Sequence, residues 1–201
     1  MNAERRTPNA KLIVLYGINN LGKTTQAKLL VERLRKEGHP AEYVKYPIYD
    51  LAPSGPRLNA YLRQGNPENL TPKEAQQLYI KNRTAYEPTL KAKLAVGTHI
   101  VAEDYTGTGI AWGIGAGVSA ALLKEKNAHL LKEDLAFLFA GERFTIATEA
   151  NHAHETNDAL MAKVRQAHEQ LGRERGWRAI NANRSVDEIH EEIWSAIQQR
   201  L

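Results

Sequence analysis

The stretch from Gly17 to Thr24 constrains this chain of 201 residues more than any other part of it. Its letters, GINNLGKT, fit the pattern G-x-x-x-x-G-K-[ST] in full. An apolar run, Lys11–Tyr16, comes directly before it, and from Thr25 onward apolar residues recur with the period of a helix. A strand, a glycine-rich turn and a helix in this order form the phosphate-binding loop, or P-loop, of nucleotide-binding proteins.

The chemistry of such a loop follows from its backbone. Glycines let successive N–H groups curl around phosphate oxygens, and the N-terminus of the following helix adds positive potential. The lysine is expected to reach the β- and γ-phosphates, and the threonine hydroxyl is expected to bind Mg²⁺. We therefore predict nucleotide contacts from Gly17, Asn19, Asn20, Leu21, Gly22, Lys23, Thr24 and Thr25.

Strand-like and helix-like segments alternate along the rest of the chain. Capping boxes begin helices at Thr71 and Ser185, and apolar spacing predicts another helix over about Asn157–Leu171. The helix after Ser185 is expected to bury Val186. The predicted fold is α/β, a P-loop NTPase-type parallel five-stranded sheet with helices on both faces, in a single domain of residues 1–201 that starts with a polar tail at 1–10. The predicted strands are Lys11–Tyr16, Ala41–Tyr46, Thr98–Ala102, Leu135–Ala140 and Arg178–Ala182.

The composition bears on where the protein is located and on which partners it binds. No apolar run approaches the roughly 20 residues that a membrane helix needs, and the chain contains no cysteine. We therefore expect a cytoplasmic protein without membrane contact. The net charge is +4, but Lys and Arg alternate with Glu in stretches such as Glu32–Glu37. That mixture is typical of a solvated helix face, so we expect no nucleic-acid partner.

A second glycine-rich run extends from Gly107 to Gly117, after the third predicted strand. It could form a dinucleotide-binding turn, but residues 103–106 separate the strand from the first glycine, and that spacing does not fit a tight strand–turn–helix unit. The favoured interpretation is a mobile segment whose backbone approaches a substrate.

Two other groups are candidates for a binding site. Glu103 and Asp104 follow the third predicted strand, where a carboxylate can hold the Mg²⁺ of a bound nucleotide, although solvated loop acids would give the same pattern. The helix after Thr71 aligns Tyr79, Asn82, Arg83 and Tyr86 on one stripe. Such a stripe can stack on a base and hydrogen-bond its edge, but it is also common in helix packing.

Taken together, these motifs resemble those of the thymidylate kinase family, over nearly the whole chain from about Lys11. The resemblance lies in their order and spacing, which are more specific than a P-loop alone. The matching segments are the P-loop followed by Thr25-Gln26, Tyr46-Pro47 after the second strand, Tyr79 with Asn82-Arg83, Glu103-Asp104-Tyr105 with Thr108, Ala111 and Trp112, and the loop from Asn181 to Ile189 with Arg184.

The resemblance implies Mg²⁺-dependent transfer of the γ-phosphoryl group of ATP to dTMP by a homodimer. It implies that Thr24 and Glu103 hold the metal and that Arg184 contacts the nucleotide on its adenine side. It also implies a lid at about 141–156. Catalysis would then depend on Lys23, Glu103, Asp104 and the lid residue Arg143. The residues that bind substrate would be Tyr46, Pro47, Tyr49, Tyr79, Asn82, Arg83, Tyr105, Thr108 and Trp112.

Three positions depart from the family pattern in their charge. Asn19 stands where the family has an acid in the P-loop, Tyr49 where it has an arginine after Phe-Pro, and Asp104 where it has the arginine of Asp-Arg-Tyr. A catalytic arginine is worth about 10³–10⁵ in rate, so its loss needs a replacement. The candidate cations are Lys45, Arg57, Arg63 and Arg143. Alternatively, Glu103 and Asp104 hold a metal more tightly.

Two alternatives stay open: a P-loop kinase for another nucleoside or nucleoside monophosphate, and a catalytically weak nucleotide-binding protein. In the lid candidate, His152 and His154 have a spacing that allows a metal site in an extended segment. Solvated histidines in a polar loop are the more common case.

Overall fold

The computed structural model describes residues 10–144 and 158–201, so part of the predicted tail and most of the predicted lid lie outside the described residues. The order of elements confirms the predicted alternation of strands and helices. The elements are β1 (Leu12–Tyr16), α1 (Lys23–Lys36), β2 (Ala41–Lys45), α2 (Ser54–Arg63), α3 (Pro72–Ala95), β3 (His99–Glu103), α4 (Thr106–Gly115), α5 (Ala120–Asn127), β4 (Leu135–Ala140), α6 (Asp158–Arg175), β5 (Arg178–Asn181) and α7 (Val186–Gln198).

The five strands form one sheet in the order β2-β3-β1-β4-β5, and all neighbouring strands are parallel. Every residue of β1 and β3 is buried, as expected for strands that are covered on both faces. The chain moves to one side of β1 for β2 and β3 and to the other side for β4 and β5. This change of direction makes a crevice at the carboxyl end of β1, where open parallel sheets bind ligands.

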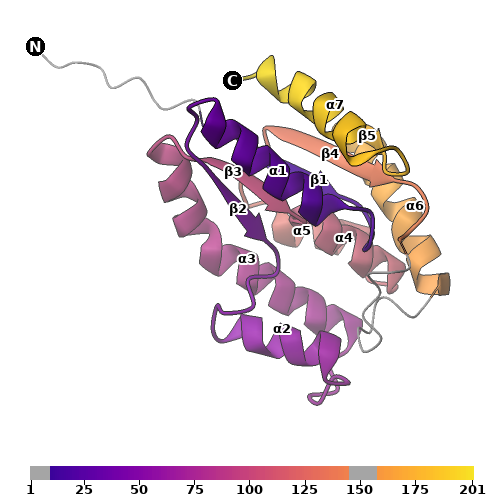
Figure 1. Ribbon diagram of the computed structural model, residues 1–201. Helices are drawn as coiled ribbons and strands as arrows, with labels where there is room; N and C mark the ends of the chain where they lie inside the picture. Colours follow the sequence, from indigo (N-terminus) through magenta and orange to yellow (C-terminus); the bar gives the residue numbers. More distant parts are fainter. Residues whose placement is uncertain (1–9, 145–157) are drawn as a thin grey trace, which may run out of the picture.

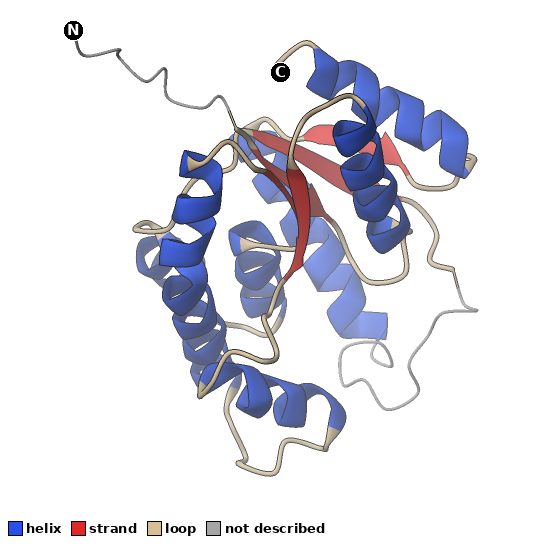
Figure 2. Cartoon of the chain, turned by 60° about the vertical axis from the view of Figure 1, so that its left-hand side comes forward, coloured by secondary structure: helices blue, strands red, loops and turns tan. Residues whose placement is uncertain are grey.

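Helices cover both faces of the sheet, which confirms the predicted fold class (Figures 1 and 2). One face carries α1, which packs beside α7, and the other carries the cluster of α3, α4 and α6. Helix α2 packs on α3 below the carboxyl edge of the sheet. The capping boxes at Thr71 and Ser185 are both formed.

Two predictions about packing are wrong. Val186 is 48% exposed, not buried, because it is the first residue of α7 and lines the open cleft, whereas Ile189 and Ile193 further along the helix are buried. The glycine run after β3 forms helix α4 and is not a mobile loop. A side chain at Gly107 would lie 2.4 Å from Trp177, and one at Gly115 would lie 2.5 Å from Val164. The glycines therefore let α4 pack closely against its neighbours.

Candidate active site

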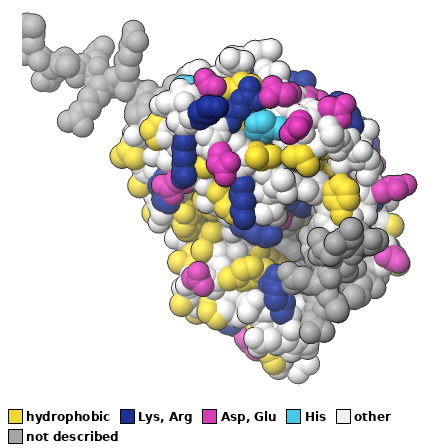
Figure 3. Space-filling model, in the orientation of Figure 1, with side chains coloured by type: hydrophobic (Ala, Val, Ile, Leu, Met, Phe, Trp, Pro, Cys, Tyr) yellow, Lys and Arg dark blue, Asp and Glu magenta, His cyan; other side chains and the backbone are white. Residues whose placement is uncertain are grey.

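A cleft of about 400 Å³ opens at the carboxyl edge of the sheet, where β1, β2 and β3 end. Figure 3 shows Lys and Arg side chains bordering a hollow on this side of the molecule. The predicted site residues that line the cleft come from the P-loop and the start of α1, from the loop after β2, from the end of β3, from α3 and α4, and from the loop before α7. They are Asn19, Asn20, Leu21, Gly22, Lys23, Thr24, Thr25, Tyr46, Pro47, Tyr49, Tyr79, Arg83, Glu103, Asp104, Tyr105, Thr108, Trp112 and Arg184.

The P-loop joins β1 to α1 in the predicted place. Gly17 has a φ of 133°, and a Cβ there would lie 2.7 Å from the carbonyl oxygen of Phe139, so this turn requires glycine. The buried Lys23 ammonium donates to the carbonyl oxygens of Gly17 and Ile18, at 3.0 and 2.7 Å. The lysine is thus folded back over its own loop, at the position from which it can turn toward a phosphate.

Glu103 is the hub of the polar contacts in the cleft. The Thr24 hydroxyl donates to its Oε2 at 2.7 Å, and the Tyr43 hydroxyl donates to the same atom at 2.5 Å. The Lys45 ammonium lies 3.0 Å from Oε1. Burial by itself raises the pKa of Glu103, but the charges of Lys23 and Lys45 and the two hydroxyl donors lower it overall. Glu103 is therefore ionised at neutral pH.

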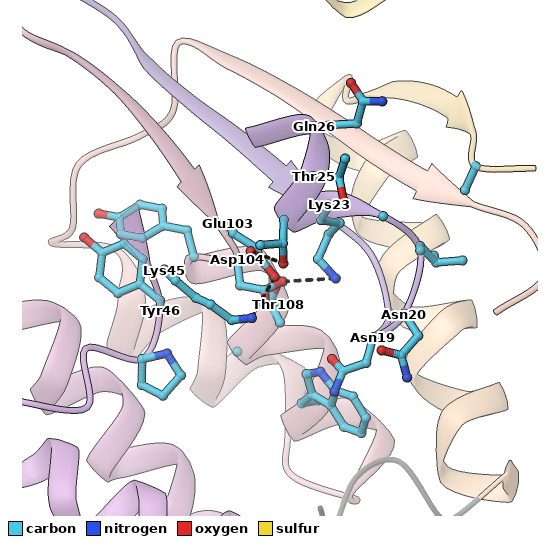
Figure 4. A pocket seen from close by; sticks show the side chains of 18 of the residues that line it. Asn19, Asn20, Lys23, Thr25, Gln26, Lys45, Tyr46, Glu103, Asp104 and Thr108 are labelled. Atoms are coloured by element: carbon cyan, nitrogen blue, oxygen red, sulfur yellow. Dashed lines mark hydrogen bonds and ion pairs between the residues drawn. The ribbon is translucent and has the colours of Figure 1, made fainter. Parts of the chain in front are cut away.

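Asp104 directly follows Glu103 at the carboxyl edge of the sheet, and its side chain points toward the P-loop. Its side chain is 14% exposed, and its Oδ1 lies 3.8 Å from the Lys23 ammonium and accepts a hydrogen bond from Thr108 at 2.9 Å. Figure 4 shows Lys23 and Asp104 facing each other across the cleft. Burial raises the pKa of Asp104, and the charge of Glu103 adds to the rise, against the opposing effect of Lys23.

Aromatic rings form the wall on the α2 and α3 side. Tyr46 packs against Tyr105, with ring centroids 5.1 Å apart, and Tyr79, Tyr49 and Trp112 complete the wall. Arg83 is buried beneath this wall. One of its terminal nitrogens donates to Asn127, and its Nε has no hydrogen-bond partner among the described residues. Burial lowers the pKa of Arg83 to about 10, so the guanidinium keeps its charge at neutral pH. This half of the cleft can therefore stack on a planar ring and donate to its edge.

The opposite wall contains Phe144, Ala182 and Val186, whose side chains are apolar, together with Arg184. Phe144 is 48% exposed and is tied to the P-loop by its backbone N–H, which donates to the carbonyl of Asn20 at 2.9 Å. Arg184 forms an ion pair with Glu192 at 2.7 Å. This wall is next to the P-loop and offers an apolar surface to a second ring.

Three predicted site residues do not line the cleft. Gly17 is a structural turn. Asn82 is fully buried and is bonded to the backbone of Ile48, as acceptor at 2.8 Å and donor at 2.9 Å, so its amide holds the Pro47–Ile48 loop and does not face a substrate. Arg143 lies at the start of the lid candidate, outside the cleft lining. The proposed histidine metal site falls on residues 152–154, outside the described residues.

The structure also decides where two of the candidate cations lie. Lys45 lines the cleft, whereas Arg57 is bound to Glu68 at the surface. Tyr43 and Lys45 both reach Glu103 because alternate residues of a strand share a face. The period of two in β2 is the sequence signal that places Tyr43 beside Lys45 on this face.

The described residues fit a magnesium site of the kind that a bound nucleotide completes. Thr24 and Glu103 bring a hydroxyl and a carboxylate to one point, and oxygen ligands of this type suit Mg²⁺. Over residues 10–144 and 158–201, no group of three or more His, Cys, Asp or Glu side chains gathers to hold a metal by itself. Phosphate oxygens and water would have to supply the remaining ligands.

The sequence matches the family model described as "Thymidylate kinase" over residues 15–193. It is similar to the thymidylate kinase of Homo sapiens, with 29% identity over 187 residues that cover 90% of this chain and 87% of the relative. The thymidylate kinase of Arabidopsis thaliana is 26% identical over 196 residues, 96% of this chain and 73% of that one. A solved thymidylate kinase structure from Candida albicans has a TM-score of 0.77 at 21% identity, with 94% and 92% of the two chains covered. Another, from Ehrlichia chaffeensis, has a TM-score of 0.75 at 18% identity, with 95% and 99% covered.

Proposed function

The chain belongs to the thymidylate kinase family, and on that premise we propose that it transfers the γ-phosphoryl group of ATP to dTMP, giving dTDP and ADP. The observation that carries the proposal is the continuity of the cleft. The P-loop lies at one end, the aromatic wall with Arg83 at the other, and Glu103 and Asp104 between them. Two nucleotides bound end to end would meet with their phosphates at this pair.

The donor half of the site is assigned to ATP. The P-loop backbone would bind the triphosphate, and Lys23 would exchange its bonds to Gly17 and Ile18 for bonds to phosphate oxygens. The apolar wall beside Arg184 would cover the adenine. Magnesium, held by Thr24 and Glu103 together with the phosphates, would neutralise charge on the triphosphate.

The acceptor half is assigned to dTMP. Tyr79 and the neighbouring rings would stack on the thymine, and Arg83 would donate to its edge. The loop of Tyr46, Pro47 and Tyr49 would hold the sugar and phosphate next to Glu103. Phosphoryl transfer depends mainly on positioning and charge neutralisation, and this arrangement brings both reactants to one point without a covalent intermediate.

Three further properties belong to the proposal. We propose one domain for residues 1–201, a homodimer and a cytoplasmic location. Size-exclusion chromatography with light scattering tests the dimer. No helix in the described part of the chain is long and apolar enough to cross a membrane.

A coupled assay of ADP release tests the proposed reaction. The enzyme would receive ATP and Mg²⁺ with dTMP, dCMP, dGMP or thymidine as acceptor. We expect turnover on dTMP to exceed that on the other three by about 100-fold or more, since a site built to hydrogen-bond one base leaves polar groups unpaired with the others. ATP binding without turnover on dTMP, or a preference for thymidine, would contradict the proposal.

A further inference from the structure

Lys45 is the last residue of β2 and lies opposite Glu103 in the sheet register. Its ammonium group is 3.0 Å from Oε1 of Glu103. The Lys45 side chain is 47% exposed and lines the cleft, whereas that of Glu103 is 5% exposed. A half-exposed ammonium group is therefore anchored by a buried carboxylate at the centre of the site.

The two lysines of the cleft approach the acidic pair from different directions. Figure 4 shows Lys23 coming from the P-loop and Lys45 from the side of Tyr46, with the carboxyl groups of Glu103 and Asp104 between them. Lys45 directly precedes Tyr46 and Pro47, which begin the aromatic wall. Lys23 thus faces the donor half of the cleft, and Lys45 faces the acceptor half.

The acceptor half needs a cation at this point. A nucleoside monophosphate carries about two negative charges at neutral pH, and it must approach the triphosphate of the donor. The arginines that line the described part of the cleft are directed elsewhere. The Arg63 guanidinium lies 4.9 Å from the centre of the Tyr49 ring, Arg83 donates to Asn127, and Arg184 is paired with Glu192.

We propose that Lys45 binds the phosphate of dTMP and neutralises charge during transfer; this inference rests on the proposed function. An oxygen of the dTMP phosphate forms the new bond to the γ-phosphorus of ATP. The bond from that phosphorus to the β–γ bridging oxygen breaks, and its electron pair leaves with ADP. No proton has to move, because the attacking oxygen is already anionic.

Glu103 makes this role feasible. When Lys45 moves toward a phosphate, Oε1 of the carboxylate gives up its ion pair, but Oε2 keeps its hydrogen bonds from Thr24 and Tyr43, so Glu103 stays held in place. Lys45 is a cation on a flexible stem, half exposed in the cleft and placed to follow a moving phosphoryl group.

The test compares Lys45→Met, Lys45→Gln and Lys45→Arg in the full-length enzyme. Calorimetry would give the affinity for dTMP, for thymidine and for ATP, and steady-state assays would give kcat and the KM of each substrate. We expect the Met and Gln variants to bind dTMP about 10- to 100-fold more weakly, the usual value of a charge-assisted hydrogen bond, and to lose kcat. Thymidine and ATP affinity should stay within about 2-fold, because neither ligand places a phosphate at this point.

Lys45→Arg should recover most of the dTMP affinity, since it keeps the charge. The matched control is Lys124→Met, which removes a lysine of similar exposure, 43%, paired with Glu174 far from the cleft. It should leave all of these affinities and kinetic constants unchanged.

Two results would overturn the inference. One is wild-type affinity for dTMP and wild-type turnover in both Lys45→Met and Lys45→Gln. The other is an equal loss of affinity for thymidine and for dTMP, which would show that Lys45 supports the aromatic wall and does not bind the phosphate. In either case wild-type turnover on dTMP would leave the proposed function standing. A wild-type enzyme that neither binds nor phosphorylates dTMP would instead overturn the function and the inference together.

Discussion

At the scale of single residues, Asp104 is the position where the charge of the site differs most from the family pattern. It has a φ of 61°, in the left-handed region, and its side chain is turned toward Lys23 and bonded by Thr108. The resemblance to the thymidylate kinase family leads one to expect an arginine there. A carboxylate in its place removes a cation from the phosphates and adds an anion beside the predicted metal ligand Glu103.

The first prediction concerns this carboxylate. Asp104→Asn keeps the shape and the bond from Thr108 but removes the charge. If Asp104 strengthens metal binding, the Mg²⁺ concentration for half-maximal turnover should rise by roughly 10-fold. The measurement is a Mg²⁺ titration of ADP release at saturating dTMP.

The control is Asp134→Asn. Asp134 belongs to a second Glu-Asp pair that precedes β4 at the opposite edge of the sheet, where it accepts from the backbone of Leu12. It should leave the Mg²⁺ requirement unchanged. An unchanged requirement in Asp104→Asn would show that the carboxylate has no part in metal binding.

Where a motif fixes residues locally, the sequence predicted residues that line the cleft. Lys23 and Thr24 follow from the P-loop pattern, and Glu103 follows from the end of a strand. Asn82 shares a helix stripe with Arg83, but only the tertiary structure shows that Ile48 occupies its amide. Residue spacing within one helix cannot show which loop from elsewhere in the chain packs against it.

At the scale of elements, α3 supports the acceptor wall through Asn82. This side chain bonds both backbone groups of Ile48 and donates to the Ser54 hydroxyl at 3.1 Å. The long helix therefore holds the segment between β2 and α2, which carries Tyr46, Pro47 and Tyr49 into the cleft.

The second prediction is that Asn82→Leu weakens this support. The substitution leaves the N–H and C=O of Ile48 unpaired, and each buried unsatisfied group costs about 1–3 kcal/mol. The free energy of unfolding in urea should therefore fall, and the KM for dTMP should rise while the KM for ATP stays the same. Gln77→Leu, at an exposed position of the same helix, should change neither the free energy of unfolding nor the KM for dTMP. A normal KM for dTMP in Asn82→Leu would argue against the supporting role.

Helix α4 shows what the sequence could not reveal about elements. The sequence predicts a mobile segment here, whose backbone approaches a substrate, because glycine allows many backbone conformations. In the structure a side chain at Gly109 would lie 2.7 Å from the Arg83 guanidinium, so the glycine makes room for a side chain from another helix. The strands were predicted closely, since runs of apolar residues between turn signals are local features.

At the scale of the whole molecule, α6 connects the stability of the fold to the P-loop. His168 of α6 is 1% exposed, and its Nδ1–H donates to the carbonyl of Val164 at 3.0 Å. Its Nε2 has no hydrogen-bond partner within the described structure. Burial, together with the charge of Lys23, lowers the pKa of His168 to about 3. The ring is therefore neutral in the folded protein at every ordinary pH.

The third prediction follows from this shift. The unfolded chain protonates His168 below a pKa of about 6.5, whereas the folded protein resists protonation down to about 3. The stability that this group provides is therefore complete above pH 6.5 and is lost as the pH falls toward 3. The free energy of unfolding should decrease by up to ~1.4 kcal/mol per pH unit through this group.

Urea unfolding of His168→Leu at a series of pH values measures this contribution. Between pH 6.5 and 4, the free energy of unfolding should depend less steeply on pH in His168→Leu than in the wild type. The exposed His129→Gln should retain the wild-type slope. Identical slopes in His168→Leu and the wild type would show that the buried ring does not resist protonation.

The central claim is direct transfer of a phosphoryl group between two nucleotides in one cleft. Its most direct test supplies the enzyme with ATP labelled at the γ-phosphate, Mg²⁺ and dTMP, and follows the label over time. The account predicts label in dTDP, one for each ADP formed, and a loss of roughly 100-fold or more in Lys23→Ala. Label released as inorganic phosphate, or an equal rate in the Lys23 variant, would contradict it.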